Sequence, residues 1–342
     1  MPQQQTIIDA YTHSTPTAYL KYIAIQPNPE MSKQAQRLLE RCKTHPNMID
    51  FDVRLSQMDK YRIAKQITCI FPEIDPNRLP TTDSNEQLKL CKMINDGMAE
   101  TMKKGRGRVL ALGTAPLKAM NDGGLEEMRR AVEELGLRGF MAVTNVGGEP
   151  VDQFTQFWDE ANRLGVAVYL HPVDPINSKS RPYEDEFDLM HVLGWPFETS
   201  LAMGRLVLSG TMSRNPNLRV VAHHLGAMIP YFSGRINESY DKDMSFIKSG
   251  QKFYKMKDEK PPIEHFDSFL LDSAIGGSVA AIKCAREVFG AEKIIFGTDY
   301  PFGPGDGSIR MARYPSVVEQ AGFSASEKQL IFEENASKLL KI

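Results

Sequence analysis

Three segments decide the fold: Tyr169-Leu-His-Pro172, Val220-Val-Ala-His-His224 and Ile294-Ile-Phe-Gly-Thr-Asp-Tyr-Pro301. Each contains a short apolar run that ends in a side chain able to bind a metal or transfer a proton, and loop residues follow soon after. A histidine that only packs in a core would more often lie in the middle of such a run. Parallel strands that each deliver one polar residue at their C-terminal ends are typical of a (β/α)8 barrel active site. The segments therefore predict that fold.

Strand-like and helix-like patterns alternate outward from these segments along the chain. The expected strands are residues 6–10, 66–71, 108–113, 138–143, 166–170, 218–222, 269–272 and 293–297. Eight such units predict one α/β domain over residues 1–342, with a parallel sheet closed into a TIM barrel. An open, doubly wound sheet is the alternative. It would need a glycine-rich phosphate turn after the first strand, where Tyr11-Thr-His-Ser-Thr15 stands instead.

Three stretches interrupt the regular alternation. Residues 26–51 follow the first strand, residues 174–196 follow the fifth, and the charged residues 244–264 precede the seventh. Insertions after barrel strands build lids and pockets. The first two stretches are therefore expected at the mouth of the active site.

Composition narrows the class of protein further. The 342 residues are 42% apolar and carry a formal net charge of −2, so no strongly basic face suggests nucleic acid as a partner. No apolar run approaches the roughly 18–20 residues that span a bilayer, so no membrane partner is expected. The four cysteines show no Cys-x-x-Cys pairing, and the first residues do not resemble an export signal. We expect a cytoplasmic protein with reduced thiols.

Histidines and carboxylates at the strand ends suggest a metal site. Asp9, Tyr11 and His13 are spaced by two, so they are expected on one face of the first strand. His171 ends the fifth strand and Asp299 the eighth. Two histidines and one carboxylate leave an open position for water or substrate, as in a catalytic divalent site. The pattern predicts a metal bound by His13, His171 and Asp299.

The sixth strand ends in two consecutive histidines. His223 is expected beside the metal, in position to move a proton. His224 should point to the opposite face of the strand, so it is interpreted as structural. Trp195, Phe197 and Phe302 are either walls of an apolar pocket or ordinary core residues.

Longer motifs resemble the amidohydrolase-2 family, and most closely its non-oxidative decarboxylases of aminocarboxymuconate semialdehyde and of aromatic acids. Residues 221–236 are similar to the family's strand-six segment, and Gly297-Thr-Asp-Tyr-Pro-Phe302 to its strand-eight signature. His171-Pro172 matches the strand-five ligand. The remaining similar segments are 95–100, 165–172, 195–199 and 335–340. The resemblance covers nearly the whole chain, with its motifs in the family's order.

The resemblance implies a metal-dependent barrel enzyme that decarboxylates a hydroxy- or amino-substituted aromatic or dienoic acid. It implies metal roles for His171 and Asp299 and an acid/base role for His223, with zinc or else manganese as the cofactor. Arg235 matches an arginine that reaches the neighbouring subunit's site in a homodimer, where it holds the substrate carboxylate. Arg54 resembles a second anchor from the same subunit. A guanidinium suits a carboxylate because it donates two parallel hydrogen bonds.

One position departs from the family pattern. The first strand usually carries His-x-His or Glu-x-His, whereas this chain has Tyr11-Thr-His13. A neutral phenol, with an ordinary pKa of about 10, is a poor metal ligand unless the metal deprotonates it. Tyr11 is therefore expected near the metal or hydrogen-bonded to a substrate oxygen. Two alternatives remain open: a hydrolase or hydratase that uses the same ligands, and a degenerate, non-catalytic barrel.

Overall fold

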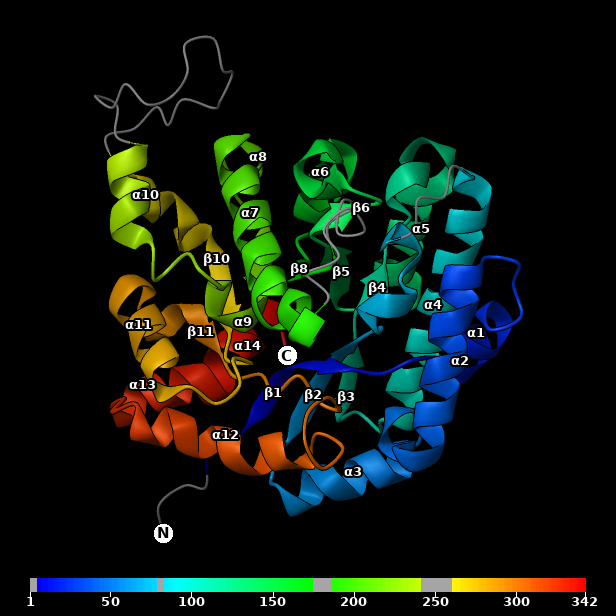
Figure 1. Cartoon of the computed structure of the whole chain (residues 1–342), viewed down its shortest axis with the longest axis horizontal. Coiled ribbons are helices and arrows are strands. Elements are labelled where there is room, and N and C mark those ends of the chain that lie inside the picture. The colour runs from blue at the N-terminus through cyan, green and yellow to red at the C-terminus, as the bar shows by residue number, and fades with distance from the viewer. Residues whose placement is uncertain (1–4, 79–82, 175–185, 241–259) are drawn as a thin grey trace.

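The computed structural model describes residues 5–78, 83–174, 186–240 and 260–342, and it has a parallel α/β fold (Figure 1). The strands are β1 Ile8–His13, β2 Lys65–Cys69, β3 Val109–Ala111, β4 Gly113–Thr114, β5 Gly139–Val143, β6 Asn145–Val146, β7 Glu149–Pro150, β8 Ala167–His171, β9 Arg219–Ala222, β10 Phe269–Asp272 and β11 Ile294–Ile295. The α-helices are α1 Thr17–Ile23, α2 Pro29–Thr44, α3 Phe51–Lys60, α4 Ser84–Lys104, α5 Leu125–Arg129, α6 Thr155–Leu164, α7 Trp195–Leu208, α8 Thr211–Arg214, α9 His223–Gly226, α10 Ser233–Ser239, α11 Val279–Phe289, α12 Ser308–Gln320, α13 Ala325–Gln329 and α14 Asn335–Leu340.

The strands pair in two parallel groups. One has the order β1-β2-β3, and the other has the order β11-β10-β9-β8-β5-β4. Strands β3 and β4 are separated by a single residue, so the stretch 109–114 belongs to both groups. The eight expected strands thus correspond to observed ones, and the predicted parallel α/β fold is confirmed. The short antiparallel hairpin of β6 and β7 was not predicted.

Hydrogen bonds also connect the first strand to the last. The amide of Ala10 donates to the carbonyl of Phe296 at 2.7 Å, and Thr12 forms a parallel bridge with Tyr300. The Asp299 amide donates to the Tyr11 carbonyl at 2.9 Å. These contacts bring the C-terminal ends of β1 and β11 together, although residues 9 and 299 lie far apart in the sequence.

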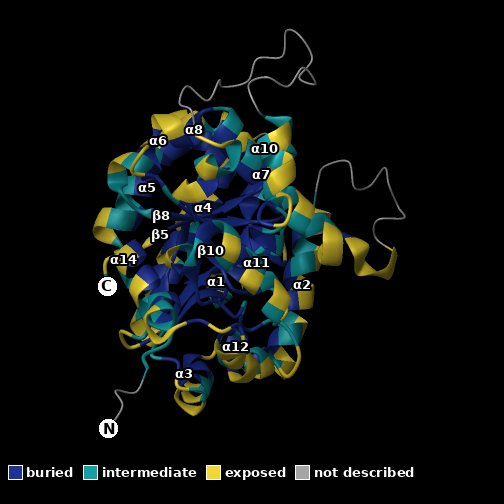
Figure 2. Cartoon of the chain, turned by 90° about the vertical axis from the view of Figure 1, so that its left-hand side faces the viewer, coloured by how far each residue is buried: buried dark blue, intermediate teal, exposed yellow. Residues whose placement is uncertain are grey.

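The strands are buried on both faces. Every residue of β5 and β8 is buried, and helices surround the strands while turning their exposed residues outward (Figure 2). The sequence of a strand that is covered on both faces is a continuous apolar run, without the alternation of apolar and polar residues that a half-exposed strand shows. Phe269-Leu-Leu of β10 is such a run. This is why the sequence showed strands as short apolar blocks between helical patterns.

The predicted insertions lie partly within the described structure. Residues 26–51 contain α2, a 3-10 turn at Pro46–Met48 and the first residue of α3. In the stretch 174–196, residues 175–185 lie outside the described residues, and the rest contains the turns η10 Glu186–Asp188 and η11 Met190–Gly194. Of the stretch 244–264, only residues 260–264 are described.

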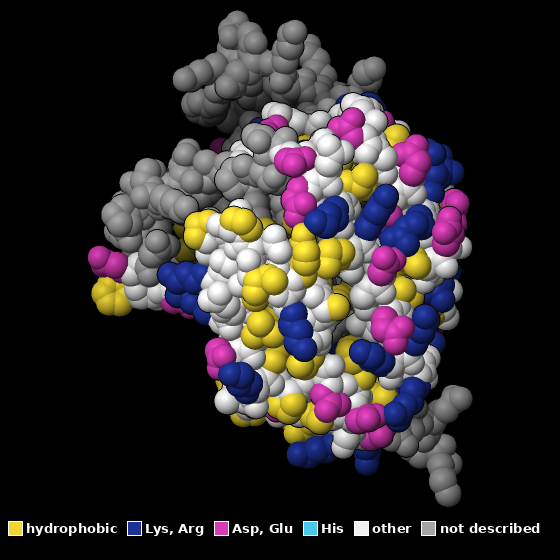
Figure 3. All heavy atoms as spheres, turned by 90° about the vertical axis from the view of Figure 1, so that its right-hand side faces the viewer, with side chains coloured by type: hydrophobic (Ala, Val, Ile, Leu, Met, Phe, Trp, Pro, Cys, Tyr) yellow, Lys and Arg dark blue, Asp and Glu magenta, His cyan; other side chains and the backbone are white. Residues whose placement is uncertain are grey.

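The surface carries charges of both signs. On the face drawn in Figure 3, lysines and arginines alternate with acidic side chains and small apolar areas. Among the described helices, none combines the length and the apolar character needed to cross a membrane.

Candidate active site

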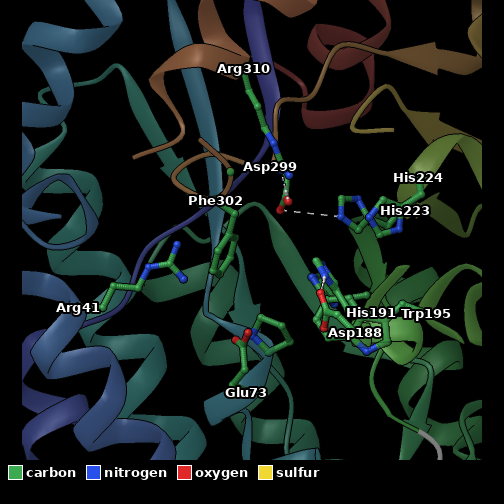
Figure 4. Close-up of a pocket in the computed structure, with 13 residues that line it drawn as sticks. Arg41, Glu73, Asp188, His191, Trp195, His223, His224, Asp299, Phe302 and Arg310 are labelled. Atoms are coloured by element: carbon green, nitrogen blue, oxygen red, sulfur yellow. Dashed lines mark hydrogen bonds and ion pairs between the residues drawn. The ribbon is translucent and has the colours of Figure 1, made fainter. Parts of the chain in front are cut away.

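A cavity of about 380 Å³ opens at the C-terminal ends of β8 and β9 and beside the segment after β11 (Figure 4). It is lined by Arg41, Pro72, Glu73, His171, Asp188, His191, Trp195, His223, His224, Asp299, Phe302, Gly303 and Arg310. Three of these, His171, His223 and Asp299, are residues that the sequence predicts for the site. Their convergence matches the expected arrangement, in which the ends of different parallel strands build one site.

Two histidines present their Nε2 atoms to this region because their Nδ1 atoms are engaged elsewhere. His171 Nδ1 donates to the Pro172 carbonyl at 2.7 Å, and His13 Nδ1 donates to the Ile70 carbonyl at 3.1 Å. The two ring centroids are 5.2 Å apart. A backbone acceptor at Nδ1 fixes the tautomer that leaves an Nε2 lone pair for a ligand. Burial, and then the nearby rings of His223 and His13, lower the pKa of His171 well below its usual value.

Asp299 connects His13 to the cavity. Its Oδ1 lies 3.2 Å from His13 Nε2, and its Oδ2 accepts a hydrogen bond from Arg310 at 2.6 Å. Burial opposes ionisation of this carboxyl, but the hydrogen bond and charge of His13, with smaller contributions from His223 and Arg310, hold its pKa well below the usual range. Burial also opposes a charge on His13, yet Cys69 and Asp299 raise the pKa of its ring. Both pKa shifts favour an ion pair between the His13 ring and the Asp299 carboxylate.

Tyr11 is fully buried beside the same histidines. Its ring stacks on the ring of His223, and its centroid lies 6.1 Å from that of His171. The phenol oxygen is buried and has no hydrogen-bond partner among the described residues. Burial raises the pKa of Tyr11 well above its usual value, and nearby acidic groups add to the effect. The phenol is therefore neutral and has an unused donor.

His223 is oriented by a carboxylate that sequence reasoning missed. Its Nδ1 donates to Asp272 Oδ2 at 2.7 Å, and the other oxygen of Asp272 accepts the Ala274 amide at 2.9 Å. The Nε2 atom of His223 lies 3.9 Å from Asp299 Oδ1. A histidine held at Nδ1 by a fixed carboxylate is arranged to accept and donate a proton at Nε2. Asp272 ends an apolar strand, and a polar residue at such a strand end is the pattern that identified Asp299. The same pattern could therefore have identified Asp272.

The prediction that His224 points to the face opposite His223 is wrong, whereas its structural role stays a prediction. His224 lines the cavity, and its ring centroid is 3.7 Å from that of His223. Strand β9 ends at Ala222, and His224 has a φ of 58°. The alternation of strand faces therefore stops one residue before the two histidines, and both can turn toward the cavity.

Neither predicted substrate arginine lines the cavity of this chain. Arg54 is fully buried and donates to Gln66 Oε1 at 2.7 Å, to the His13 carbonyl at 2.9 Å and to Thr12 Oγ1 at 2.9 Å. These bonds hold β1 and occupy its guanidinium within the protein. Arg235 is exposed on α10. Its predicted role in a neighbouring subunit stays a prediction.

Two other arginines do reach the cavity. Arg41 projects from α2 and lies over the Phe302 ring at 5.3 Å, and Arg310 projects from α12 to Asp299. Sequence reasoning missed both, because an arginine on an amphipathic helix is usually a solvated surface residue. Only the tertiary position of α2, within the insertion after β1, brings Arg41 to the pocket (Figure 4).

The donor set of two histidines and one carboxylate fits a divalent cation in chemical type. His13 Nε2 is buried and lies 3.2 Å from Asp299 Oδ1, and burial lowers the pKa of His171, which favours its neutral ring. Within the described part of the chain, no three His, Cys, Asp or Glu side chains already surround a common point at metal-binding distances. Asp299 is engaged by His13 and Arg310. To hold a cation, His13 would have to be deprotonated at Nε2, since metal ligands must be deprotonated.

The fold and this cavity place the chain among enzymes built on parallel α/β sheets with the active site at the strand ends. The amidohydrolase family model Amidohydro_2 matches residues 42–342, and the chain belongs to that family.

Named relatives in this family are decarboxylases. The chain is 28% identical over 298 residues to 2-amino-3-carboxymuconate-6-semialdehyde decarboxylase of Dictyostelium discoideum, covering 86% of this chain and 77% of the relative. The structure of 5-carboxyvanillate decarboxylase from Sphingomonas paucimobilis has a TM-score of 0.83 at 21% identity, covering 99% of this chain and 100% of the other. Dihydroxybenzoic acid decarboxylase from Polaromonas sp. JS666, solved with bound manganese and 2-nitroresorcinol, has a TM-score of 0.74 at 24% identity, covering 99% and 97%.

Proposed function

We propose that this chain is a metal-dependent, non-oxidative decarboxylase of a hydroxy- or amino-substituted aromatic or dienoic carboxylic acid. The observation that carries the proposal is that His223, held by Asp272, lines a cavity together with Arg41, an arginine without a carboxylate partner among the described residues. A proton carrier and a carboxylate anchor are what this reaction needs from the protein. The names of the family relatives point to the same chemistry.

Each cavity residue then has a role in the reaction. Arg41 binds a carboxylate of the substrate, because its guanidinium has no carboxylate partner among the described residues. Trp195 and Phe302 pack against the unsaturated carbon frame. His223, protonated at Nε2, gives that proton to the carbon that bears the leaving carboxylate. The C–C bond then breaks, its electron pair returns to the substrate's conjugated system, and CO2 leaves. Asp272 stabilises the imidazolium before the transfer.

We propose that His13, His171 and Asp299 hold a divalent ion, with Tyr11 beside it. Zinc suits the two histidines and one carboxylate, and manganese is the ion bound in the Polaromonas enzyme. When bound, such an ion supplies a Lewis acid that polarises and orients a substrate oxygen.

We also propose that the eight strands close into one (β/α)8 barrel, with insertions after strands one and five at its mouth. The hydrogen bonds from β1 to the segment after β11, including Ala10 to Phe296, support closure. Arg41 from the first insertion lines the cavity, as an insertion at the mouth would.

A homodimer is the proposed assembly, with Arg235 completing the partner's pocket. Leu193, Phe197 and Leu201 repeat every four residues along η11 and α7 and are 60%, 49% and 47% exposed. An exposed apolar row of this kind is costly in a monomer and is suited to contact with another subunit. Mixing His223→Ala and Arg235→Ala chains tests this proposal, because mixed dimers would contain one intact site and recover part of the activity. No recovery would contradict a shared site.

The decisive experiment is a screen of metal-loaded protein against hydroxybenzoates and muconate-type acids in D2O. We expect CO2 release, with deuterium at the carbon that lost it, and loss of both in His223→Ala. Water incorporation without CO2 would favour a hydrolase or hydratase. No turnover of any acid, together with no bound metal, would favour a non-catalytic barrel. A cytoplasmic location is also proposed, supported by four free cysteines.

A further inference from the structure

We infer that Glu73 forms a second subsite of the cavity, one that binds a hydrogen-bond-donating substituent of the substrate, an amino or a hydroxyl group. The inference rests on the proposed function and narrows the class of acid that the site selects. It assigns a specificity-determining role to a residue in the turn η2 Pro72–Ile74, which begins three residues after β2 ends.

The Glu73 carboxylate lines the cavity with an unused acceptor. Neither carboxylate oxygen of Glu73 accepts a hydrogen bond from the described residues: Oε2 is buried against the protein, which leaves Oε1 as the oxygen that a ligand can reach. Leaving a buried carboxylate oxygen without a donor is unfavourable, and a ligand that supplies the donor removes that penalty. The free energy therefore favours ligands with an N–H or O–H group at this place over ligands with an apolar group there.

The other carboxylates of the cavity wall are already engaged. Asp188 accepts a hydrogen bond from His191 at 3.0 Å, and Asp299 is held by His13 and Arg310. Among the lining residues, Glu73 is thus the carboxylate for which the structure shows neither an ion pair nor a hydrogen bond from a side chain. It is available to a ligand without displacing an existing contact.

The two arginines of the cavity also differ in whether they are paired with a carboxylate. Arg310 is paired with Asp299, whereas Arg41 has no carboxylate partner in the described part of the chain. Arg41 and Glu73 lie on one side of the cavity, away from His223 and His224 (Figure 4), and no ion pair joins them to each other. One unpaired cation and one unpaired anion on the same side complement a ligand that carries a carboxylate and a separate donor. A ligand with a second carboxylate next to Glu73 would be repelled by the Glu73 carboxylate.

Paired benzoates test this inference directly. The probes are 2-hydroxybenzoates with an amino, hydroxyl or methyl group at the same ring position, with positions 3 to 6 taken in turn. Both the dissociation constant by calorimetry and kcat/KM for CO2 release are measured on the metal-loaded protein. At one ring position, we expect the wild type to prefer the donor-bearing acid over its methyl counterpart by about 10- to 100-fold.

Substitutions at Glu73 assign that preference to its carboxylate. Glu73→Val should reduce the preference to within about 3-fold, and Glu73→Gln, which keeps an acceptor oxygen but not the charge, should retain part of it. The control is Glu126→Gln on α5, which makes the same change at an exposed position and should leave the preference unchanged. A structural defect would weaken all probes equally, so it would not change the ratio.

The two proposals fail in different ways. A binding preference that depends on Glu73, without CO2 from any acid, would overturn the decarboxylase and leave the subsite standing. CO2 release with the same donor-to-methyl ratio in wild type and Glu73→Val would overturn the subsite alone. A wild type that shows no preference at any ring position would overturn it as well.

Discussion

The ring of Tyr11 stacks on the imidazole of His223, with centroids 4.0 Å apart and an angle of 12° between the planes. This contact gives the first prediction, because Tyr11→Phe keeps the stacking and removes only the phenol oxygen. That oxygen is buried and has no hydrogen-bond partner in the part of the chain that the structure describes. We expect the free energy of unfolding of the metal-free protein to stay the same or rise by about 1 kcal/mol, since an unsatisfied group is lost.

Tyr11→Phe should also lower the catalytic efficiency about 10-fold, because the phenol can no longer bind a substrate oxygen. Urea denaturation and steady-state kinetics measure the two effects, and a large loss of stability would contradict them.

Asp272→Asn should lower kcat by about 10²- to 10⁴-fold with little change in KM. The Ala274 amide needs an acceptor at position 272, so the new amide would direct its oxygen there and its NH2 toward His223 Nδ1. That arrangement forces the wrong tautomer on His223. The matched control is Asp122→Asn at an exposed site, which should be neutral. A rise in KM with an unchanged kcat would show that Asp272 acts on binding and not on proton transfer.

Removal of the metal should destabilise the wild type and leave a ligand variant unaffected. We expect chelation to lower the Tm of the wild type, because a ligand that binds only the folded state adds to its stability. His171→Ala should hold less than one tenth of the metal of the wild type, and chelation should hardly shift its Tm. His45→Ala, outside the cavity lining, serves as the control and should retain full metal content. Metal analysis by mass spectrometry and thermal unfolding provide the measurements, and normal metal content in His171→Ala would rule out the proposed ligand.

Arg41→Met should raise KM for the acid by about 10- to 100-fold while kcat changes less, because a charge-assisted bond to the substrate carboxylate is lost. Arg37 is exposed on the same helix, and Arg37→Met removes the same charge outside the cavity lining. It should leave KM nearly unchanged. Steady-state kinetics on the best acid from the screen distinguish the two variants, and an equal effect of both would indicate long-range electrostatics.

The contribution of Asp75 to stability should fall as the pH rises from about 4 to about 7. Burial raises the pKa of Asp75 to about 7, although hydrogen bonds from Asn77 oppose the shift. Between these pH values the Asp75 carboxyl keeps its proton in the folded state but has lost it in the unfolded state. The free energy of unfolding therefore decreases as the pH rises. Asp75→Asn mimics the neutral acid and should reduce the loss between pH 5 and pH 7 by an amount of the order of 2 kcal/mol. Urea unfolding at both pH values measures this difference, and an unchanged slope would contradict it.

Much of the fold was predictable, because buried parallel strands leave a simple signature of apolar blocks between helical patterns. The same logic placed His171, His223 and Asp299, since each follows such a block at the end of a strand. Arg54 shows what a sequence motif cannot predict, which is the set of contacts that its side chain makes. A matching motif predicts an arginine at that position, but only the three-dimensional contacts show that its donors are used on His13, Thr12 and Gln66.

Other site residues had no local signal at all. Arg41, Glu73 and Arg310 reach the cavity from a helix, a turn and another helix that lie apart in the sequence. Their roles depend on long-range packing, which residue spacing cannot reveal. His224 was misplaced for a local reason, because a positive φ at that residue ends the alternation that the prediction assumed.

The link between β1 and the segment after β11 also bears on how the protein reaches its native state. The Thr298 amide donates to Asp9 Oδ1 at 2.9 Å across 289 positions of sequence. A growing polypeptide cannot form this contact until nearly all of its residues have been synthesised, and closing so long a loop slows folding. His13 and Asp299 come from the two sides of that junction, so the proposed metal site needs both ends of the chain to be in place. A partly synthesised or truncated chain would therefore be inactive even where most of its strands have already paired.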